Sequence, residues 1–205
     1  MVVDGSDLVE TAPGANTAPP LLLLQGTGGT NEEMLTFGRR LAPQSPLITI
    51  AGRIGVGAQR QYFQQTASQT ANPEQISQEA AWLGMTVEQV CQQHRWSSDD
   101  LIVVGYSNGA AMAAYGVQMG LLPGQAAILF HPLRVATPMA VDRPGYRVWL
   151  SAGQHDPLVQ VATVQQVAAD CERAGMTTTV EVTGGTHQLT PQEVMAAHNW
   201  LAENY

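Results

Sequence analysis

A serine stands in a glycine-flanked turn near the middle of the chain. The segment 105–109 reads GYSNG and matches the pattern G-x-S-x-G. The apolar run 101–104 leads into it and the small-residue run 110–114 leaves it, as a strand and a helix would. In that context a serine hydroxyl is exposed at a helix N-terminus, where it can act as a nucleophile. Ser107 is therefore the first candidate catalytic residue, and the alternative is an ordinary tight turn with a capping serine.

A serine nucleophile needs a general base, and the base needs an acidic partner. In a strand–turn–helix site of this kind, the acid follows the serine along the chain and the histidine follows the acid. Asp156 fits this order because it follows the apolar run 147–152 and precedes a helical stretch. Asp142 lies in a proline-flanked loop and Asp170 lies inside a helical stretch, so both fit less well. The alternative for Asp156 is a helix cap or an Asx turn.

Five histidines compete for the role of the base. They are His94, His131, His155, His187 and His198. His187 follows the last apolar run and precedes the last helical stretch, which is where the base is expected. His131 belongs to the same end of the predicted sheet but precedes Asp156 in the chain. His94 precedes a strand, His155 adjoins Asp156, and His198 lies inside a helical stretch.

A glycine-rich loop follows the first apolar run. Residues 25–30 read QGTGGT and open a helical stretch. We interpret this loop as an oxyanion loop, in which the backbone N–H groups of Thr27 and Asn108 donate to the charge that develops on a substrate carbonyl. A phosphate cradle at a helix N-terminus and a plain turn are the alternatives. A Walker A motif is excluded because no G-K-[ST] follows.

Six apolar runs along the chain predict the strands that position these residues. They occupy residues 21–25, 47–51, 101–105, 126–130, 147–152 and 177–182. Most are continuous rather than alternating, which is typical of parallel strands covered on both faces. In the strand order 2-1-3-4-5-6, the runs 21–25 and 101–105 are neighbours. Their carboxyl ends would then bring the glycine-rich loop next to Ser107.

Helical stretches separate the apolar runs. Thr30 with Glu33 and Thr190 with Glu193 form two predicted capping boxes. The predicted helices cover residues 30–42, 73–95, 108–120, 158–174 and the C-terminal stretch from residue 190, with a break near Gly84. This alternation predicts an α/β fold, with a doubly wound, mainly parallel sheet of about six or seven strands and helices on both faces.

Length and composition predict one ordinary globular domain. The chain has 205 residues, of which 44% are hydrophobic and 13% are charged. We expect an N-terminal arm over residues 1–20 and a single domain over residues 21–205, with one irregular insert over residues 57–72. Cys91 and Cys171 are expected to be reduced, partly buried thiols rather than a disulfide or a metal site.

The net charge of the chain and the residues at its start indicate which partners and which cellular compartment to expect. The net charge of −8 gives no electrostatic reason to bind nucleic acid or an anionic membrane. The start of the chain lacks the basic region of a signal peptide, and the apolar run 20–24 is too short to span a bilayer. We therefore expect a cytoplasmic protein without a membrane partner.

Together these motifs resemble the α/β-hydrolase superfamily, and most closely its small, lidless carboxylesterase/phospholipase branch, which is similar to the dienelactone hydrolases. The segments 26–29, 105–110, 153–157 and 185–187 carry the resemblance, in the family's order, over about nine-tenths of the chain. The resemblance implies that Ser107 forms an acyl-enzyme, that His187 transfers the proton, and that Asp156 orients His187. It also implies a small-molecule ester as the partner, no cofactor, no metal, and a monomer or homodimer.

Two departures from the family pattern bear on the activity. The family usually has histidine before the glycine-rich loop, and this chain has Gln25, which changes how the loop is braced but removes no backbone donor. Dienelactone hydrolases proper use a cysteine nucleophile, and this chain has Ser107. The second departure favours ester hydrolysis over dienelactone hydrolysis.

The substrate pocket is predicted from residues that follow the strands. Only about sixteen residues separate the apolar runs 126–130 and 147–152, too few for a folded lid, so we expect an open, shallow site that favours short acyl chains. The candidate pocket residues are Gly26, Gly28, Tyr62, Phe63, Tyr106 and His131, with Arg53 or Arg60 placed to meet a polar group of the substrate. Packing of the aromatic rings in the core and solvation of the arginines are the alternatives.

The leading hypothesis is therefore a serine carboxylesterase. A thioesterase or lysophospholipase would use the same three side chains, and the sequence does not separate these activities. A ligand-binding protein on a hydrolase scaffold is an alternative of another class, but it would need no nucleophile, base and acid together. A nucleotide- or phosphate-binding domain is the third alternative, and it depends only on the loop 26–29.

Overall fold

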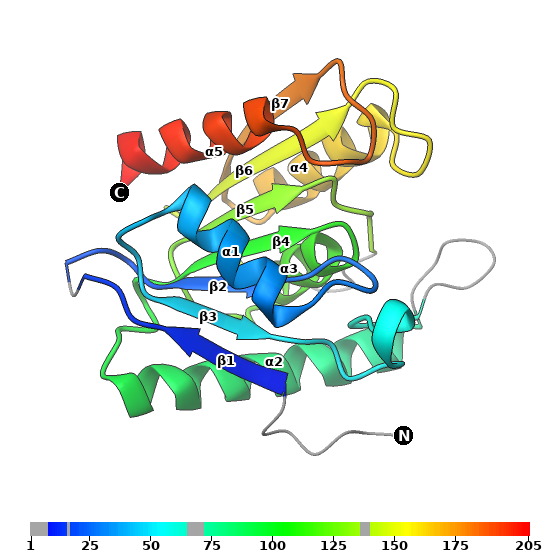
Figure 1. The fold of residues 1–205 in the computed structure, drawn as a ribbon. Coiled ribbons are helices and arrows are strands. Elements are labelled where there is room, and N and C mark those ends of the chain that lie inside the picture. Colours follow the sequence, from blue (N-terminus) through cyan, green and yellow to red (C-terminus); the bar gives the residue numbers. More distant parts are fainter. Residues whose placement is uncertain (1–7, 16, 65–71, 136–139) are drawn as a thin grey trace.

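The computed structural model describes residues 8–15, 17–64, 72–135 and 140–205. Within these residues, one sheet of seven strands forms the centre of the fold (Figure 1). The strands are β1 (Val9–Ala12), β2 (Leu21–Leu24), β3 (Leu47–Ile50), β4 (Ile102–Tyr106), β5 (Ala126–Phe130), β6 (Arg147–Gly153) and β7 (Thr177–Thr183). They lie in the order β1-β3-β2-β4-β5-β6-β7, and β1 with β3 is the antiparallel pair among parallel ones.

The parallel strands lie in the order 2-1-3-4-5-6 that is assumed above for the six apolar runs. β2 and β4 are adjacent, and Leu24 lies opposite Gly105 at their carboxyl ends. The chain therefore leaves both strands at the same edge of the sheet. This edge is where open α/β sheets bind their ligands, because the crossover direction reverses between the two strands.

Residues 9–12 of the predicted N-terminal arm form β1 at the edge of the sheet. Leu8, just before this strand, is buried, and the guanidinium of Arg39 donates hydrogen bonds to the backbone carbonyls of Pro13 and Ser45. These contacts attach part of the predicted arm to the main body of the fold. The boundary at residue 20 stays a prediction.

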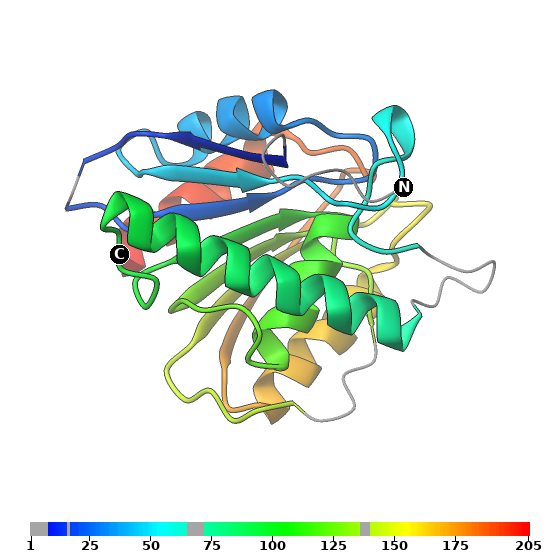
Figure 2. The same ribbon diagram turned by 90° about the horizontal axis from the view of Figure 1, so that it is seen from below.

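Five helices of the described chain cover the two faces of the sheet. They are α1 (Asn31–Leu41), α2 (Pro73–His94), α3 (Asn108–Gln118), α4 (Val161–Arg173) and α5 (Pro191–Asn204). Helices α1 and α5 lie on one face, and α2, α3 and α4 lie on the other (Figure 2). Both predicted capping boxes are present, at Thr30 with Glu33 and at Thr190 with Glu193. They fix the starts of α1 and α5, which directly follow the two loops of the candidate site.

The predicted break near Gly84 is wrong, because α2 runs through this residue without interruption. A Cβ atom at position 84 would lie 2.0 Å from the carbonyl oxygen of Leu121. The glycine therefore serves the close approach of α2 to the loop after α3, and tertiary packing outweighs the low helix propensity of glycine. In the predicted irregular insert, residues 57–59 form a short 3₁₀ helix, and residues 65–71 lie outside the described part of the chain.

Parallel strands β2, β3 and β5 are buried on both faces, as their continuous apolar runs predict, whereas the edge strand β7 is partly exposed. Each residue of β2, β3 and β5 is buried. The strand side chains divide between a core under α2, α3 and α4 and a smaller core under α1 and α5. These two cores hold the carboxyl ends of the strands in fixed positions, and the loops of the candidate site start from those ends.

The two cysteines are buried free thiols. Burial and the nearby Glu88 carboxylate raise the pKa of Cys91 to about 11, and burial raises the pKa of Cys171 to about 12. Both thiols are therefore protonated at neutral pH. None of the helices in the described part of the chain combines the length and the apolar character that a bilayer crossing requires.

Candidate active site

Ser107 occupies a strained turn between β4 and α3. Its backbone has φ 54° and ψ −114°, a conformation that L residues seldom adopt. The turn requires glycine on both sides. A Cβ at Gly105 would lie 2.6 Å from the carbonyl oxygen of Gly109, and a Cβ at Gly109 would lie 2.4 Å from that of Leu24. The spacing G-x-S-x-G thus allows β2, β4 and α3 to approach closely enough to present the serine at the edge of the sheet.

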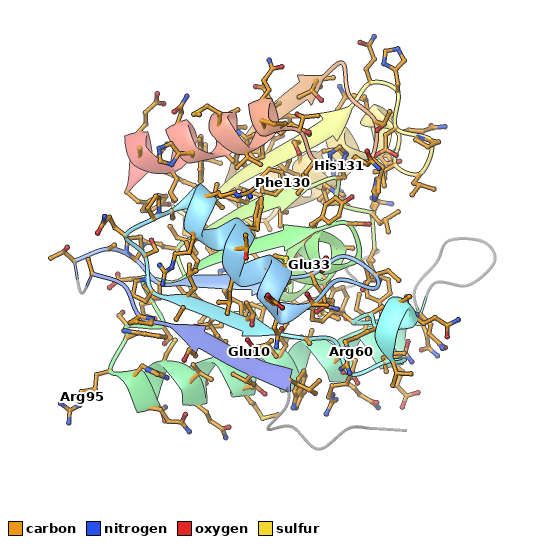
Figure 3. All side chains as sticks on the ribbon, in the orientation of Figure 1. Glu10, Glu33, Arg60, Arg95, Phe130 and His131 are labelled. Carbon is orange, nitrogen blue, oxygen red and sulfur yellow. The ribbon has the colours of Figure 1, made fainter. Side chains whose placement is uncertain are left out.

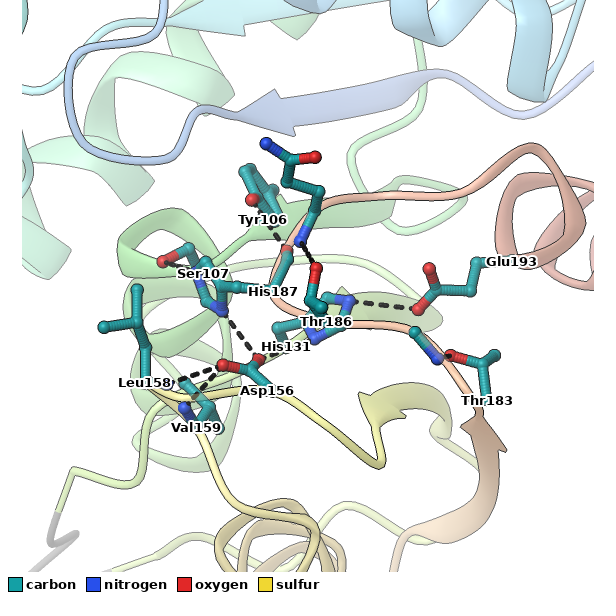
Figure 4. A network of polar contacts seen from close by, with 12 residues as sticks. Tyr106, Ser107, His131, Asp156, Leu158, Val159, Thr183, Thr186, His187 and Glu193 are labelled. Carbon is teal, nitrogen blue, oxygen red and sulfur yellow. Dashed lines mark hydrogen bonds and ion pairs between the residues drawn. The ribbon is translucent and has the colours of Figure 1, made fainter.

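His187 lies in the loop between β7 and α5 and contacts both other residues of the predicted triad (Figure 4). Its Nε2 atom lies 2.9 Å from Oγ of Ser107, and its Nδ1 atom lies 2.7 Å from Oδ2 of Asp156. With the proton on Nδ1, the ring donates to Asp156 and accepts from the serine hydroxyl. This is the arrangement in which an imidazole can remove the serine proton.

Asp156 lies in the loop between β6 and α4, and its two oxygens have different partners. Oδ1 accepts hydrogen bonds from the backbone N–H groups of Leu158 at 2.7 Å and Val159 at 2.9 Å, while Oδ2 faces His187. Burial would raise the pKa of Asp156, but the hydrogen bonds from Val159, His187 and Leu158 outweigh it and hold that pKa below its usual value. An Asx turn is the alternative role for Asp156. The bonds from Leu158 and Val159 are of this type, and they orient the carboxylate.

The glycine-rich loop lies beside the serine. Gly28 N–H donates to the carbonyl of Arg60, and Gly29 N–H donates to the carbonyl of Gly26. Within the described chain, the N–H groups of Thr27 and Asn108 have no acceptor. Thr27 lines the same cavity as Ser107, and Asn108 begins α3 directly after the serine. The two N–H groups that the sequence selects as oxyanion donors are therefore free to bind a ligand within this part of the chain.

A cavity of about 260 Å³ opens in front of the serine. It is lined by Gly26, Thr27, Tyr106, Ser107, Leu133, Leu158, Val159 and His187. Of the predicted pocket residues, Gly26 and Tyr106 line this cavity. Gly28 does not, because it packs against the turn at Ala58.

The prediction that Tyr62 and Phe63 line an acyl pocket is wrong. Both side chains are buried in the core, at 2% and 1% exposure. The backbone N–H of Tyr62 and the backbone carbonyl of Phe63 bind the side-chain amide of Asn108. The Tyr62 hydroxyl donates to the carbonyl of Ile50 and accepts from the N–H of Gln25. These residues brace the nucleophile turn and the glycine-rich loop from behind.

The two arginines considered for substrate binding are paired within the protein. Arg53 forms a two-point ion pair with Glu79 at 2.8 Å and stacks on the ring of Trp82. Arg60 donates to the backbone carbonyl of Gly52. Neither guanidinium lines the cavity at Ser107.

His131 does not line the cavity either, because it is completely buried. It follows Phe130 at the carboxyl end of β5 (Figure 3). Its Nδ1 atom lies 3.0 Å from Oδ2 of Asp156. The predicted pocket residue is thus a second histidine on the same carboxylate oxygen that His187 contacts.

The remaining candidates for acid and base lie in other environments. His155 and His198 bind the backbone carbonyls of Gly184 and Leu41, and His94 stacks on the ring of Trp96. Asp170 pairs with Arg134 and Arg173. Choosing His187 and Asp156 by chain order therefore selects the histidine that contacts Ser107 and the aspartate that contacts this histidine.

Sequence reasoning missed the apolar wall of the cavity, formed by Leu133, Leu158 and Val159. One sequence signal was available for Leu158, because it is a large apolar residue directly after Asp156 and Pro157. In the structure this side chain is 57% exposed. No comparable signal marks Glu193, whose carboxylate faces His131. Its place in a capping box accounts for the residue type completely.

One group of potential metal ligands occurs in the described chain, formed by His131, Asp156 and His187. The Nδ1 atoms of both rings lie at hydrogen-bond distance from the same oxygen, Oδ2 of Asp156. Such spacing suits a proton between each nitrogen and the oxygen, which is the arrangement a triad needs. The group is therefore explained by hydrogen bonding.

Comparison with known proteins is consistent with this geometry. The model of the dienelactone hydrolase family matches residues 10–193. The chain belongs to the dienelactone hydrolase family. The chain has the α/β-hydrolase fold, which the sequence motifs also predict.

Individual members and neighbours agree with the family assignment. MhqD of Bacillus subtilis (strain 168) is 28% identical over 186 residues, covering 89% of this chain and 92% of that protein. The structure of YahD with malic acid is 28% identical, with a TM-score of 0.90 over 96% of this chain and 98% of YahD. The carboxylesterase of Bacillus cereus has a TM-score of 0.91 at 24% identity, over 96% and 94% of the two chains, and shows the same fold.

Proposed function

We propose that this member of the dienelactone hydrolase family is a serine carboxylesterase that hydrolyses small carboxylic esters. One observation carries the proposal. His187 lies between Ser107 and Asp156, with Nε2 at 2.9 Å from the serine oxygen and Nδ1 at 2.7 Å from the carboxylate oxygen. These three residues can perform acyl transfer without any further group, so the proposed enzyme needs no cofactor and no metal.

In the proposed reaction, Oγ of Ser107 attacks the ester carbonyl while Nε2 of His187 takes the hydroxyl proton. Asp156 stabilises the imidazolium through Nδ1, and it stays ionised because its pKa is lowered. The N–H groups of Thr27 and Asn108 donate to the oxyanion. His187 then gives its proton to the leaving alcohol, and an acyl-enzyme remains on Ser107. Water attacks this acyl group with His187 again as the base, which releases the acid and restores the serine.

The cavity supports a small acyl group. Its volume of about 260 Å³ lies below the range of about 300–1,000 Å³ that is usual for drug-sized ligands. Leu133, Leu158 and Val159 supply apolar contacts, so an acetyl or butyryl chain fits better than a long fatty acyl chain. The triad supports acyl transfer as the reaction class, and this apolar wall supports the preference for short acyl chains.

Hydrolysis of p-nitrophenyl acetate, butyrate and octanoate by the wild type and by Ser107→Ala tests the proposal. We expect kcat to fall by about 10⁴-fold or more in Ser107→Ala, because the nucleophile is removed while the fold remains. Ser77→Ala, on α2, is the matched control and should retain wild-type turnover. Equal turnover by wild type and Ser107→Ala would contradict the assignment. So would a wild type that neither turns over these esters nor is labelled at Ser107 by a fluorophosphonate.

A further inference from the structure

His131 lies between two carboxylates, and nothing in the proposed reaction uses it. Its Nδ1 atom lies 3.0 Å from Oδ2 of Asp156, and its Nε2 atom lies 3.0 Å from Oε1 of Glu193 (Figure 4). The first contact is a hydrogen bond, and the second has the distance of an ion pair without regular hydrogen-bond geometry. All three side chains are completely buried, with 0% exposure. A buried group of this kind requires that its charges balance.

The three residues come from three separate elements around the His187 loop. His131 follows β5 with a left-handed backbone (φ 50°), and its N–H donates to the carbonyl of Ser151 on β6. Asp156 lies in the β6–α4 loop, and Glu193 lies in the first turn of α5. The other oxygen of Glu193 accepts from the N–H and the hydroxyl of Thr190, both at 3.0 Å. His131 therefore connects the acid of the triad to the helix that begins just after His187.

The position of the proton follows from the donors around each carboxylate. Asp156 accepts from two backbone N–H groups and from His187, and Glu193 accepts twice from Thr190. Burial opposes ionisation of both acids. The bonds from Val159, His187 and Leu158 outweigh it and lower the pKa of Asp156, and His131 with Thr190 outweighs it and lowers the pKa of Glu193. A neutral imidazole has one nitrogen without hydrogen, and that lone pair would face an ionised carboxylate at 3.0 Å. An imidazolium donates a hydrogen bond to Asp156 and forms an ion pair with Glu193.

We propose that His131 is a positioning residue that carries a proton on both ring nitrogens and clamps Asp156 and Glu193 in place around the His187 loop. The contacts of His131 with the two carboxylates do not depend on what the protein catalyses. The effect of these contacts on the reaction rests on the function proposed above. His131 touches no substrate and no reacting atom, so it acts through Asp156.

Four titratable groups face His131 in this cluster. The ring of His131 lies 5.3 Å from the ring of His187 and 6.2 Å from the ring of Tyr106, measured between centroids, and it contacts Asp156 and Glu193 directly. Burial and the two carboxylates raise the pKa of Tyr106, so the phenol is neutral. The charges that act on His187 are therefore two negative carboxylates and the positive charge of His131.

The effect on the reaction follows from the shared oxygen of Asp156. His131 contacts the same Oδ2 atom that faces Nδ1 of His187. Loss of the His131 ring removes one of the contacts that fix this oxygen, so His187 is held less well in line with Ser107.

Imidazole nitrogen and proton NMR of the ¹⁵N-histidine-labelled protein tests this proposal without using turnover. In the wild type, we expect both ring nitrogens of His131 to carry hydrogen at pH 7, because each faces a carboxylate oxygen. Glu193→Gln removes one of the two carboxylates, so one ring nitrogen of His131 should then lack hydrogen at pH 7. Glutamine at position 193 can still complete the capping box, so α5 keeps its start.

Two results would overturn the clamp: a wild-type His131 ring with one unprotonated nitrogen at pH 7, or a His131 ring that keeps both hydrogens in Glu193→Gln. If Glu193→Gln does not fold, the wild-type spectrum alone decides. Where the protein hydrolyses p-nitrophenyl esters, His131→Asn should lower kcat with little change in KM, because the contact that holds Asp156 is lost while the cavity is unchanged. Failure of ester hydrolysis would contradict the proposed function and leave the NMR test of the clamp intact, so the two failures are distinguishable.

Discussion

The hydroxyl of Tyr106 donates a hydrogen bond to the backbone carbonyl of His187 across 2.9 Å. This bond links the residue just before the nucleophile to the loop that carries the base. Gly26 provides room for the Tyr106 ring, since a Cβ at position 26 would lie 2.9 Å from that ring. One side chain therefore coordinates the nucleophile turn, the glycine-rich loop and the His187 loop.

Replacing Tyr106 with phenylalanine should loosen the His187 loop while keeping the ring. The lost hydrogen bond should lower the free energy of unfolding by about 1 kcal/mol. We expect kcat for p-nitrophenyl acetate to fall by about threefold to tenfold with little change in KM, because the base is held less well in line with Ser107. Steady-state kinetics and urea unfolding measure the two effects. Tyr205→Phe is the control, because its hydroxyl makes only a long contact, 3.4 Å, at the other end of the sheet. An unchanged kcat in Tyr106→Phe would show that the bond does not position His187.

The lowered pKa of Asp156 predicts how the stability of the protein depends on pH. A carboxyl group whose pKa is lower in the folded state stabilises the fold above its unfolded value of about 3.9, and this stabilisation is lost as the pH falls through the folded value. Asp156→Asn keeps the shape and can still accept the N–H bonds of Leu158 and Val159. We therefore expect it to be less stable than the wild type at pH 7, with a difference that shrinks below about pH 4. Urea unfolding at a series of pH values measures this, and a difference independent of pH would contradict it.

The residues of the predicted triad could be found from the sequence, because a short local motif identifies the serine and the order along the chain identifies the acid and the histidine. A strand, a glycine-flanked serine and a helix identify position 107, and chain order then reduces several aspartates and histidines to Asp156 and His187. The continuous apolar runs identify the parallel strands in the same way. These signals act within a few residues, so no knowledge of distant contacts is needed. The runs do not encode the order of the strands in the sheet, and the order 2-1-3-4-5-6 is an assumption that the structure matches.

The pocket could not be predicted, because burial depends on contacts between distant segments. Tyr62 and Phe63 follow a strand at the correct edge, but the amide of Asn108, 46 and 45 residues away, draws their backbone inward. His131 is also at the correct edge, and its partner Glu193 comes from the last helix. The unbroken helix at Gly84 has the same cause, since the reason for the glycine is the carbonyl of Leu121.

The nucleophile turn should not tolerate a side chain at position 109. Gly109→Ala places a Cβ 2.4 Å from the carbonyl oxygen of Leu24, and backbone atoms on both sides leave no flexible group to move. We expect a loss of about 3 kcal/mol or more in the free energy of unfolding, or no folded protein. Gly184→Ala is the matched control, because its Cβ position has no neighbour within 4 Å and its φ is not positive. Thermal unfolding followed by circular dichroism compares the two, and equal midpoints would contradict the packing argument.

The apolar wall should set the acyl-chain preference. Leu158 lines the cavity and is 57% exposed, so a larger side chain can be placed there without disturbing the core. Leu158→Trp should fill part of the space in front of Ser107 and lower kcat/KM for p-nitrophenyl butyrate by about tenfold relative to acetate, while Leu158→Ala should improve the longer ester relative to acetate. Met195→Trp, on α5, is the control for adding an indole at an exposed apolar position, since Met195 is 58% exposed and does not line this cavity. A ratio of butyrate to acetate that stays constant across the Leu158 variants would mean that the acyl chain binds elsewhere. Opposite shifts in Leu158→Trp and Leu158→Ala would place the chain against this wall, because only a group in contact with position 158 responds in both directions to its volume.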